Sequence, residues 1–327
     1  MINIINDNTS PYFNLALEEY LLKEFTQECF MLWRNAPSII VGKNQNTLSE
    51  INADYVRDHD ISVVRRLSGG GTVFHDLGNL NFTFIVNDKE NSFVDFKRFT
   101  LPIIEALRKL SVYAELSGRN DLVIDGKKFS GNAQYRTKDR LLHHGTLLFA
   151  SSISDLTSAL KVDPSKFEGK GIKSVESRVT NISEHLRQPL TITEFKKTIM
   201  EHIGSSHKEF QLYELSGHDI EAVNGMVREK YAAWEWNFGS SPAYNFSNRK
   251  KFTGGSIEAC LNVDGGIIRQ IKLYGDFFGK LDIGDIEQTI TGTKHEESAV
   301  RQALSHFDVN NYLSNITIDE FMSVLFR

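Results

Sequence analysis

Cysteine is scarce in this sequence, with two residues in 327, Cys29 and Cys260, far apart along the chain. So few thiols argue against a disulfide framework and indicate a reducing, cytoplasmic location. Long apolar runs are missing as well, since no stretch approaches the roughly 18–20 apolar residues of a membrane span. The opening MINIINDNTS has no charged segment followed by an apolar one, so it is not a signal peptide. We therefore expect a cytoplasmic protein that does not enter a membrane.

Positive charge is not in excess, because 37 Lys and Arg residues are outnumbered by 42 Asp and Glu residues. With a net charge of −5 and a pI of about 6.1, no global basic field attracts nucleic acid. No basic segment interleaved with aromatic residues supports nucleic-acid binding either. Fixed-period repeats and low-complexity tracts are absent. The length predicts two domains, or one large domain with an appendage.

Several common phosphate and metal motifs are missing. No segment has the spacing of a P-loop, and a dinucleotide fingerprint would need glycine at Phe74 after Gly69 and Gly71. Neither paired CxxC nor HExxH occurs. His143 and His144 are neighbours on a predicted strand, so they point to opposite faces and do not easily share one metal ion.

What the sequence does contain is a series of hairpin-forming strands with fewer helices. Ser10 and Pro11 predict the start of an amphipathic helix at 9–25. Asp125-Gly126 predicts a tight two-residue turn between two strands of 121–136. Further strands are expected at 30–42, 61–67, 79–86, 143–150 and 254–275, and further helices at 94–110, 151–161, 191–203 and 218–232.

The composition changes at 236–250, which is rich in Ser, Asn and Gly. We interpret this stretch as a junction between a catalytic domain at 1–240 and a small α+β accessory domain at 250–327. Because strands outnumber helices and occur as hairpins, the fold class of the larger part is α+β, with a mixed or antiparallel sheet flanked by helices.

The stretch VVRRLSGGGTVFHD (63–76) places three consecutive glycines between two strands. Glycine loses the most conformational freedom on folding, so three in a row need a reason. One explanation is a tight strand connection. The other is a bound ligand, because bare glycine N–H groups form an anion-binding concavity and Arg65 and Arg66 supply fixed positive charge.

The strand KKFSGNA (127–133) predicts that Lys128, Ser130 and Asn132 share one face. The simpler reading is that Lys127 and Lys128 are solvated charges at a hairpin end. The preceding GRND offers Asn120 and Asp121, which could orient a ligand or hold Mg²⁺, or simply cap a turn.

Together these segments resemble a known family. NLALEEYLL, RRLSGGGTVFHDLGNLNFTF, GRNDLVIDGKKFSGNAQYR, HHGTLLF and KGIKSVESRVTNI follow the order and spacing of the lipoate–protein ligase A family. The resemblance covers most of 10–190, and the tail from WNFGSSPAYN onward is similar, more loosely, to the accessory domain of the two-domain bacterial members. The implied fold is the biotin/lipoate ligase catalytic fold, which is related to class II synthetase cores.

The resemblance implies a two-step reaction. Lipoate and MgATP first give lipoyl-adenylate and pyrophosphate. The lipoyl group then passes to a lysine on a lipoyl domain, either of a 2-oxoacid dehydrogenase E2 subunit or of glycine-cleavage H protein. Cations suit this chemistry because carboxylate and triphosphate are both anions. We expect the enzyme to act as a monomer.

The resemblance also implies roles for individual residues. Arg66, Ser68, Gly69, Gly70 and Gly71 correspond to the lipoate-binding loop. Arg66 would bind phosphate or carboxylate oxygen, and Lys128 would contact both the lipoate carbonyl and the α-phosphate. His144 is expected as a pocket wall or as a buried structural histidine. The nucleotide site is expected to contain Gly71, Thr72, Val73, Phe74, Asn120, Asp121 and Ser174. Ser174 lies in the loop at 171–180 that would close over the adenylate, and Asp121 would hold Mg²⁺.

Three alternatives remain at this stage. An ATP-independent lipoyl or octanoyl transferase of the same fold needs a nucleophilic cysteine, yet neither Cys29 nor Cys260 adjoins a motif. A biotin ligase would carry a glycine–arginine–glycine loop, which RRLSGGG lacks. A non-catalytic ligand-binding relative would have little reason to retain Lys128, Arg66 and Asp121.

Overall fold

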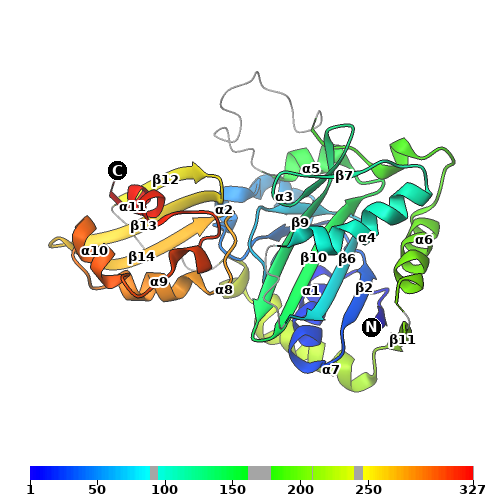
Figure 1. Ribbon diagram of the computed structural model, residues 1–327, viewed down its shortest axis with the longest axis horizontal. Coiled ribbons are helices and arrows are strands. Elements are labelled where there is room, and N and C mark those ends of the chain that lie inside the picture. Colours follow the sequence, from blue (N-terminus) through cyan, green and yellow to red (C-terminus); the bar gives the residue numbers. More distant parts are fainter. Residues whose placement is uncertain (89–94, 161–177, 208, 239–245, 327) are drawn as a thin grey trace.

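The computed structural model describes residues 1–88, 95–160, 178–207, 209–238 and 246–326, and it has the expected α+β architecture (Figure 1). A large domain with the N-terminus lies on the right of Figure 1, and a smaller C-terminal domain lies on the left. The strands of the large domain are β1 (Ile2–Ile5), β2 (Cys29–Trp33), β3 (Ser38–Val41), β4 (Ser62–Arg65), β5 (Val73–His75), β6 (Asn79–Asn87), β7 (Glu115–Ser117), β8 (Asp121–Ile124), β9 (Lys127–Thr137), β10 (Arg140–Leu148) and β11 (Gln211–Glu214).

Helices and short turns connect these strands. The larger helices are α1 (Pro11–Glu24), α4 (Phe96–Lys109), α6 (Ile192–Ser205) and α7 (Gly217–Met226). The shorter elements are α2 (Thr47–Glu50), α3 (Ala53–Asp58), α5 (Ile153–Ala159), η3 (Ile182–His185), η4 (Val227–Tyr231) and α8 (Trp234–Asn237). Most of the expected helices and strands are therefore present, with boundaries shifted by a few residues.

Eight of the described strands form one mixed sheet in the order β11-β1-β2-β6-β10-β9-β8-β7. The pairs β11–β1 and β1–β2 are parallel, whereas the pairs from β2 to β7 are antiparallel. The hairpin β8–β9 turns at Asp125 and Gly126, both with positive φ (51° and 75°). This is the geometry that favours Asp-Gly in a two-residue turn, so the expected hairpin is confirmed.

The two faces of this sheet are covered differently. Helices α4 and α6 cover one face, where the aromatic side chains of the central strands meet the helices. This core includes Phe30, Phe82, Phe84, Phe99, Ile103, Phe195 and Ile199. Helix α1 lies on the other face together with a small sheet in the order β4-β3-β5. The glycine loop connects β4 to β5, so it lies above this second face.

Helix α1 begins as expected but is not amphipathic. Ser10 caps it by accepting a hydrogen bond from the backbone N–H of Phe13, and Pro11 occupies the first turn. Apart from Tyr12, every residue from Pro11 to Leu22 is buried. The helix is enclosed between the large sheet and later elements such as η4, and this buries both of its faces. It therefore carries two carboxylates, Glu18 and Glu19, into the protein interior.

The C-terminal domain has its own antiparallel sheet and its own core. Strands β12 (Phe246–Phe252), β13 (Gly255–Asp264) and β14 (Ile267–Gly275) pair in sequence order. The strands expected at 254–275 are β13 and β14, whereas β12 was not predicted. Helices α9 (Ile283–Ile290), α10 (Glu297–Ala303) and α11 (Ile318–Phe326), with the turn η5 (Val309–Asn311), accompany this sheet. The core residues of this domain lie between Ile257 and Leu325. The proposed boundaries at 240 and 250 flank a stretch that includes residues outside the described ones, and they remain a prediction.

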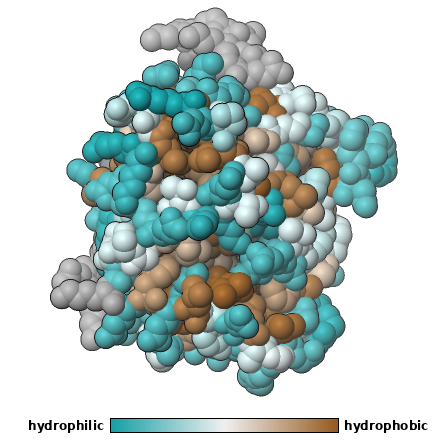
Figure 2. All heavy atoms as spheres, turned by 90° about the vertical axis from the view of Figure 1, so that its right-hand side faces the viewer, coloured by the Kyte–Doolittle hydropathy of each residue, from teal (hydrophilic) through white to brown (hydrophobic). Residues whose placement is uncertain are grey.

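The outer surface of the large domain on the α6 side mixes hydrophilic and hydrophobic residues (Figure 2). Apolar atoms commonly supply more than half of a folded surface, so this mixture alone does not mark a binding site. Within the part of the chain that the structure describes, no helix is both long enough and apolar enough to cross a membrane.

Candidate functional site

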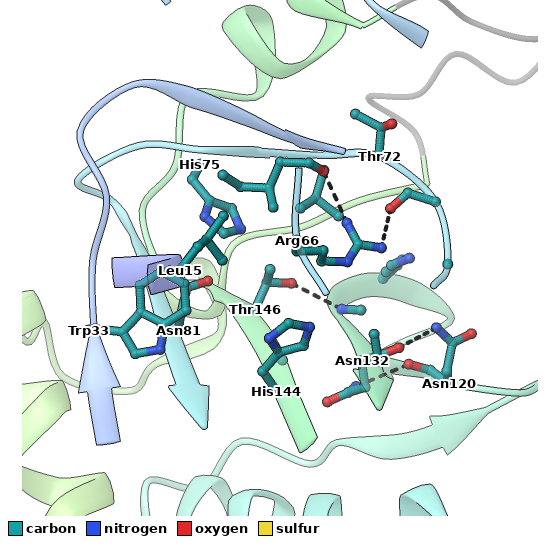
Figure 3. Close-up of a pocket in the computed structure, with 18 residues that line it drawn as sticks. Leu15, Trp33, Arg66, Thr72, His75, Asn81, Asn120, Asn132, His144 and Thr146 are labelled. Carbon is teal, nitrogen blue, oxygen red and sulfur yellow. Dashed lines mark hydrogen bonds between the residues drawn. The ribbon is translucent and has the colours of Figure 1, made fainter. Parts of the chain in front are cut away.

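A cavity of about 100 Å³ lies between the large sheet and the small sheet, beside the glycine loop (Figure 3). Its walls come from segments that are far apart in sequence, as expected for a site built on a sheet face. The lining residues are Leu15, Trp33, Ile40, Arg66, Gly70, Gly71, Thr72, Val73, His75, Asn81, Asn120, Lys128, Gly131, Asn132, Ala133, His144, Gly145 and Thr146.

The two ends of the cavity differ in chemistry. Leu15 and Trp33 lie at one end, with His75 and Asn81 beside them (Figure 3). Arg66, Thr72, Asn120 and Asn132 belong to the opposite end, where Lys128 also contributes. A cavity that is mainly apolar at one end and cationic at the other suits a long molecule with an apolar chain and an anionic head.

Arg66 is buried at the polar end and holds the glycine loop in shape. Its Nε donates to Ser68 Oγ at 3.0 Å, and Nη2 donates to the carbonyls of Gly69 (2.7 Å) and Gly71 (2.8 Å). Nη1 donates to the carbonyl of Ile40 at 3.0 Å. Burial lowers the pKa of Arg66 to about 10, so the guanidinium remains charged at neutral pH. It can therefore attract an anion while it braces the loop.

Arg65, by contrast, is a structural residue. Its side chain donates hydrogen bonds to the carbonyls of Gly42, Gln45 and Trp236 at 2.7–2.8 Å, and to Thr47 Oγ1 at 2.7 Å. These bonds fasten the loop after β3 and the chain near α8 to strand β4. The sequence interpretation that both arginines serve an anion therefore does not fit the position of Arg65.

The glycine loop contacts the C-terminal domain at Gly69 and Gly70, where there is no room for side chains. Gly70 has φ +88°, and a Cβ there would lie 3.0 Å from the ring of Phe278. A Cβ on Gly69 would lie 2.5 Å from the carbonyl oxygen of Phe277. By contrast, nothing lies within 4 Å of a Cβ built on Gly71, which faces the cavity. Gly69 and Gly70 are thus needed for packing and backbone conformation, whereas Gly71 leaves space in the cavity.

Phe278 also connects the loop to the segment before β8. The Arg119 guanidinium carbon lies 4.4 Å from the centre of the Phe278 ring, and Arg119 donates hydrogen bonds to the carbonyls of Gly254 and Asp276. Phe96 packs on another side of Phe278, with ring centres 5.7 Å apart. The C-terminal domain therefore supports both the glycine loop and the hairpin that carries Lys128.

Strands β8 and β9 change register beside Lys128. Val123 pairs with Lys128, whereas Leu122 pairs with Ser130, which leaves Phe129 as an extra residue in β9. An extra residue in one strand is a β-bulge, and it reverses the alternation of side chains beyond that point.

The bulge changes which residues accompany Lys128. A Cβ on Gly131 would lie 3.1 Å from Lys128 Nζ, so these two residues share the cavity face. Ser130 and Asn132 flank Gly131, and their side chains lie on the α4 side of the sheet, where Asn132 Nδ2 donates to Ser130 Oγ and Asn132 Oδ1 lies 3.3 Å from His143 Nε2. Asn132 also borders the cavity, but its side chain and that of Ser130 do not share a face with Lys128, so this prediction is wrong. Lys128 still lines the cavity. The bulge at Phe129 changes the orientation of the residues that follow it, but not that of Lys128 itself.

Asp121 lies beside Lys128, with Oδ1 2.8 Å from Lys128 Nζ. Both side chains are partly exposed, at 37% and 40%, so the carboxylate remains accessible from the mouth of the cavity. Asn120 Nδ2 donates to the carbonyl of Asn132, which fixes the turn before β8 against β9. The structure thus brings Asn120, Asp121 and Lys128 together.

A buried chain of hydrogen bonds ends at the glycine loop. His144 Nε2 lies 2.6 Å from Ser68 Oγ, and Nδ1 lies 3.0 Å from both carboxylate oxygens of Glu18. Ser68 Oγ already accepts a bond from Arg66, so its own proton is donated to His144 Nε2. The His144 proton is then on Nδ1 and is donated to Glu18.

This chain has the order nucleophile, base and acid of a hydrolase, but its geometry favours a structural role. Ser68 is fully buried and does not line the cavity. Glu18 also accepts a bond from Thr83 Oγ1 at 2.6 Å, and Thr83 in turn accepts one from Trp33 Nε1 at 2.8 Å. The chain therefore holds two cavity walls, Trp33 and His144. Sequence reasoning missed Glu18, although an acid in so apolar a helix was a signal.

Four of the described predicted site residues do not line the cavity: Ser68, Gly69, Phe74 and Asp121, the last of which lies beside it at Lys128. Phe74 packs among apolar side chains of the small sheet, including Ile39 and Val41, so its side chain does not line the cavity. Ser68 Oγ and the carbonyl of Gly69 accept hydrogen bonds from Arg66, and neither residue lines the cavity. Ser174 lies outside the described residues. The described residues Arg178 and Thr180 hydrogen-bond through their backbones to Lys128, so these two residues lie beside the cavity.

The described residues contain no group of three or more His, Cys, Asp or Glu side chains placed to hold a metal ion. Magnesium, however, is usually bound by one or two carboxylates together with substrate phosphates. A single accessible carboxylate, Asp121, beside a cationic cavity fits that mode of binding.

Residues 10–204 match the family described as "Lipoyl protein ligase A/B catalytic domain", and 241–325 match "Bacterial lipoate protein ligase C-terminus". Lipoate-protein ligase LplJ of Bacillus subtilis is 46% identical, with 100% of both chains covered. Lipoate–protein ligase 1 of Staphylococcus aureus is 45% identical, with 98% of each covered.

Solved structures are similar as well. LipL1 of P. falciparum in complex with lipoate has a TM-score of 0.82 at 25% identity, and the match covers 100% of this chain and 98% of that one. A bipartite lipoate protein ligase of Thermoplasma acidophilum, solved with its E2 lipoyl domain, has a TM-score of 0.66 at 26% identity over 75% and 98%. A lipoate-protein ligase A bound with ATP has a TM-score of 0.65 at 24% identity over 72% and 98%.

The loop, the cavity and the two matched regions thus lead to one conclusion, which agrees with the resemblance seen in the sequence. This chain belongs to the lipoyl protein ligase A/B family.

Proposed function

We propose that the cavity binds lipoate and MgATP, forms lipoyl-adenylate, and passes the lipoyl group to a lysine of a lipoyl domain. The chain is a lipoate–protein ligase, in keeping with full-length relatives of that name at 45–46% identity. The observation that supports the reaction best is the cavity itself, with an apolar end at Leu15 and Trp33 and cationic groups at Arg66 and Lys128.

In this proposal, lipoate lies with its acyl chain toward Trp33 and its carboxylate toward Lys128. Burying an apolar chain of this kind contributes roughly 0.8 kcal/mol per methylene group. The carboxylate stays near the mouth of the cavity, where ATP can approach it. The bare backbone of Gly71 allows close passage, because no atom lies within 4 Å of a Cβ built there.

Lys128 stabilises the negative charge that develops as the carboxylate oxygen attacks the α-phosphate. Arg66, charged and buried at the same end, contributes a second fixed cation. Asn120, Thr72 and the backbone near Gly71 would contact the nucleotide. Asp121 would hold Mg²⁺ together with the phosphates, and this ion would neutralise charge on the pyrophosphate that departs.

The acceptor in this proposal is a lipoyl domain, such as those of E2 subunits or of H protein. Its lysine amine would attack the carbonyl of the adenylate, forming the amide and releasing AMP and a proton. Lys128 would hold that carbonyl in place. The anhydride must be protected from water, and Arg178 and Thr180 hydrogen-bond to Lys128, where a cover is needed. We further propose that the enzyme acts as a monomer in the cytoplasm.

An ATP-independent transferase is the competing function, and the position of Cys29 disfavours it. Cys29 is 1% exposed within an apolar core, and burial raises the pKa of its thiol to about 11. A thiol with so high a pKa is a poor nucleophile. Cys260 is buried in the C-terminal sheet.

The deciding experiment combines purified protein, lipoate, ATP, Mg²⁺ and an apo lipoyl domain, and follows the mass of the acceptor. If the protein is a ligase, the mass of the acceptor increases by one lipoyl group. This increase requires lipoate, ATP, Mg²⁺ and the apo lipoyl domain together. An increase obtained from a lipoyl or octanoyl thioester without ATP would support the transferase instead.

A further inference from the structure

Two polar nitrogen atoms at the apolar end of the cavity are buried without hydrogen-bond partners in the described part of the chain. They are His75 Nε2 and Asn81 Nδ2. Both residues line the cavity, and they are only 3% and 2% exposed. Leaving a buried donor unsatisfied is unfavourable, and most such groups in folded proteins find a partner. Two unsatisfied groups together at one end of a cavity therefore need an explanation.

The hydrogen-bond network shows which nitrogen of His75 carries the proton. Asn14 Nδ2 donates to Asn35 Oδ1 at 2.9 Å, so the other end of the Asn35 amide, Nδ2, faces His75. Asn35 Nδ2 donates to His75 Nδ1 at 3.1 Å, which makes Nδ1 an acceptor. The ring is neutral, because burial lowers the pKa of His75 to about 3. Its proton is then on Nε2, which is a donor without an acceptor.

Among the described residues, Asn81 is oriented by a single side-chain hydrogen bond. Its Oδ1 accepts from Asn79 Nδ2 at 2.9 Å, which leaves Asn81 Nδ2 toward the cavity and Asn79 Oδ1, outside the cavity lining, also without a partner in that part of the chain. The neighbouring indole of Trp33 is already satisfied, because its Nε1 donates to Thr83 Oγ1. Two N–H donors, one from β5 and one from β6, thus remain beside apolar walls.

We propose that Asn81 and His75 recognise the sulfur-containing ring at the end of lipoate, so that the cavity prefers lipoate to octanoate, the all-carbon acid of equal chain length. The inference rests on the proposed function, since it requires that the acyl chain end lies at Leu15 and Trp33. The disulfide ring of lipoate offers sulfur atoms, which are weak acceptors. Octanoate offers only methyl and methylene hydrogens there, so both donors would remain unpaired.

The expected preference for lipoate over octanoate depends on the difference in free energy between a buried donor that is hydrogen-bonded and one that is not. A site built with hydrogen-bond donors discriminates against a ligand that lacks the acceptor. Because sulfur is a weak acceptor, we expect a preference of about tenfold in kcat/KM rather than the larger factors seen for hydroxyl groups. We expect Asn81 to account for part of this preference, so that its substitution removes that part.

Asn81→Val and Asn81→Thr form the test pair, because valine and threonine have nearly the same shape and only threonine offers an O–H donor. Both variants lose the amide that accepts from Asn79. The rates of transfer to an apo lipoyl domain are measured with lipoate and with octanoate. We expect Asn81→Val to lower the lipoate/octanoate ratio of kcat/KM about fivefold or more, and Asn81→Thr to stay near wild type. Asn3→Val is the control, because Asn3 is an equally buried asparagine of β1 that does not line the cavity, and it should leave the ratio unchanged.

The outcomes separate this inference from the proposed function. If wild type transfers neither acid in the presence of ATP, the proposed function itself fails. If wild type transfers both and the two Asn81 variants have equal ratios, donor recognition is overturned, and a bound water satisfies the nitrogens instead. Calorimetric binding of lipoate and octanoate to the wild-type chain is measured in parallel. Equal dissociation constants would overturn the inference even if the variants do not fold.

Discussion

Lys128 Nζ lies 2.8 Å from Asp121 Oδ1 across the bulged pair of strands β8 and β9. A partly exposed pair of this kind adds little to stability, but it keeps the ammonium group at the mouth of the cavity. We therefore expect Lys128→Ala to reduce lipoate-dependent ATP–pyrophosphate exchange by about 10²–10³-fold, the usual effect of removing a donor to a developing oxyanion. The free energy of unfolding should change by no more than about 0.5 kcal/mol.

Lys127→Ala is the matched control for Lys128→Ala. Lys127 is exposed and pairs with Ile124, so it lies on the opposite face from its neighbour. Its exchange rate should remain near wild type. Equal loss in the two variants would mean that the hairpin as a whole, rather than the ammonium group of Lys128, matters for adenylation.

The glycine loop predicts two different responses to added side chains. Gly71→Val should fold normally, because nothing lies within 4 Å of its Cβ, but it should raise the KM for lipoate strongly by narrowing the cavity. Gly70→Ala should instead destabilise the protein by about 1 kcal/mol or more, because φ is +88° there and the Phe278 ring is close. Steady-state kinetics and thermal melting distinguish the two effects. A Gly71→Val enzyme with unchanged KM would mean that the loop is only a strand connection.

Neither thiol should be required for activity. We expect the double variant Cys29→Ala, Cys260→Ala to keep most of its ligase rate, since Cys29 is buried with a pKa raised to about 11. Alanine is used because it removes each sulfur atom without introducing a hydroxyl group at a buried position. A correctly folded double variant that cannot transfer acyl groups would favour the cysteine-dependent transferase.

Stability should fall as the pH drops below about 6.5. Burial lowers the pKa of His143 well below 6.5, so the folded state leaves this ring neutral while the unfolded chain binds a proton. The stability that comes from a neutral buried histidine is present above the unfolded pKa and is lost as the pH falls. Between pH 7 and 5, His143 therefore contributes a loss of stability.

His143→Phe tests this pH dependence, because a phenyl ring can replace the imidazole between Phe82 and Phe99. Urea unfolding at pH 7 and pH 5 should show a smaller loss of unfolding free energy in the variant than in wild type. The comparison uses the difference between two pH values, so a constant cost of the substitution cancels. The same loss in both proteins would place the pH sensitivity on other groups.

Removing the ring of Phe278 should affect lipoate binding from outside the cavity. Phe278→Ala takes away the surface on which Gly70 and Arg119 rest, so we expect the KM for lipoate to rise severalfold. Phe321→Ala is the matched control, because Phe321 is also fully buried but belongs to the core of the C-terminal domain. Both variants should be less stable than wild type, and only Phe278→Ala should change the KM for lipoate.

A fragment of residues 1–245 lacks Phe278 altogether. We therefore expect it to stay soluble but to adenylate lipoate poorly.

Local signals in the sequence predicted much of the fold. Ser10 with Pro11 and Asp125 with Gly126 act through their own backbones, so a helix start and a hairpin turn could be predicted without the tertiary structure. The amphipathic character expected for α1 was wrong, because elements later in the chain enclose its second face. A hydrophobic pattern shows how apolar a segment is, but not how many neighbours will cover it.

The candidate site was predicted less completely. The glycine loop and Lys128 could be found from residue type and spacing, but the bulge at Phe129 could not, because it depends on how two strands pair. Glu18 and Phe278 were missed for a related reason. They reach the site from helix α1 and from the C-terminal domain, and only the folded chain brings them to the loop between β4 and β5.

The position of Phe278 under the glycine loop has a consequence for biosynthesis. A ribosome makes the large domain first, and N-terminal domains generally fold before later ones are complete. The loop that contains Gly70 would then form while its supporting ring is still unsynthesised or inside the ribosomal exit tunnel. Competence to activate an acyl group would thus arrive late in translation, which would keep a reactive anhydride from forming on an unfinished chain.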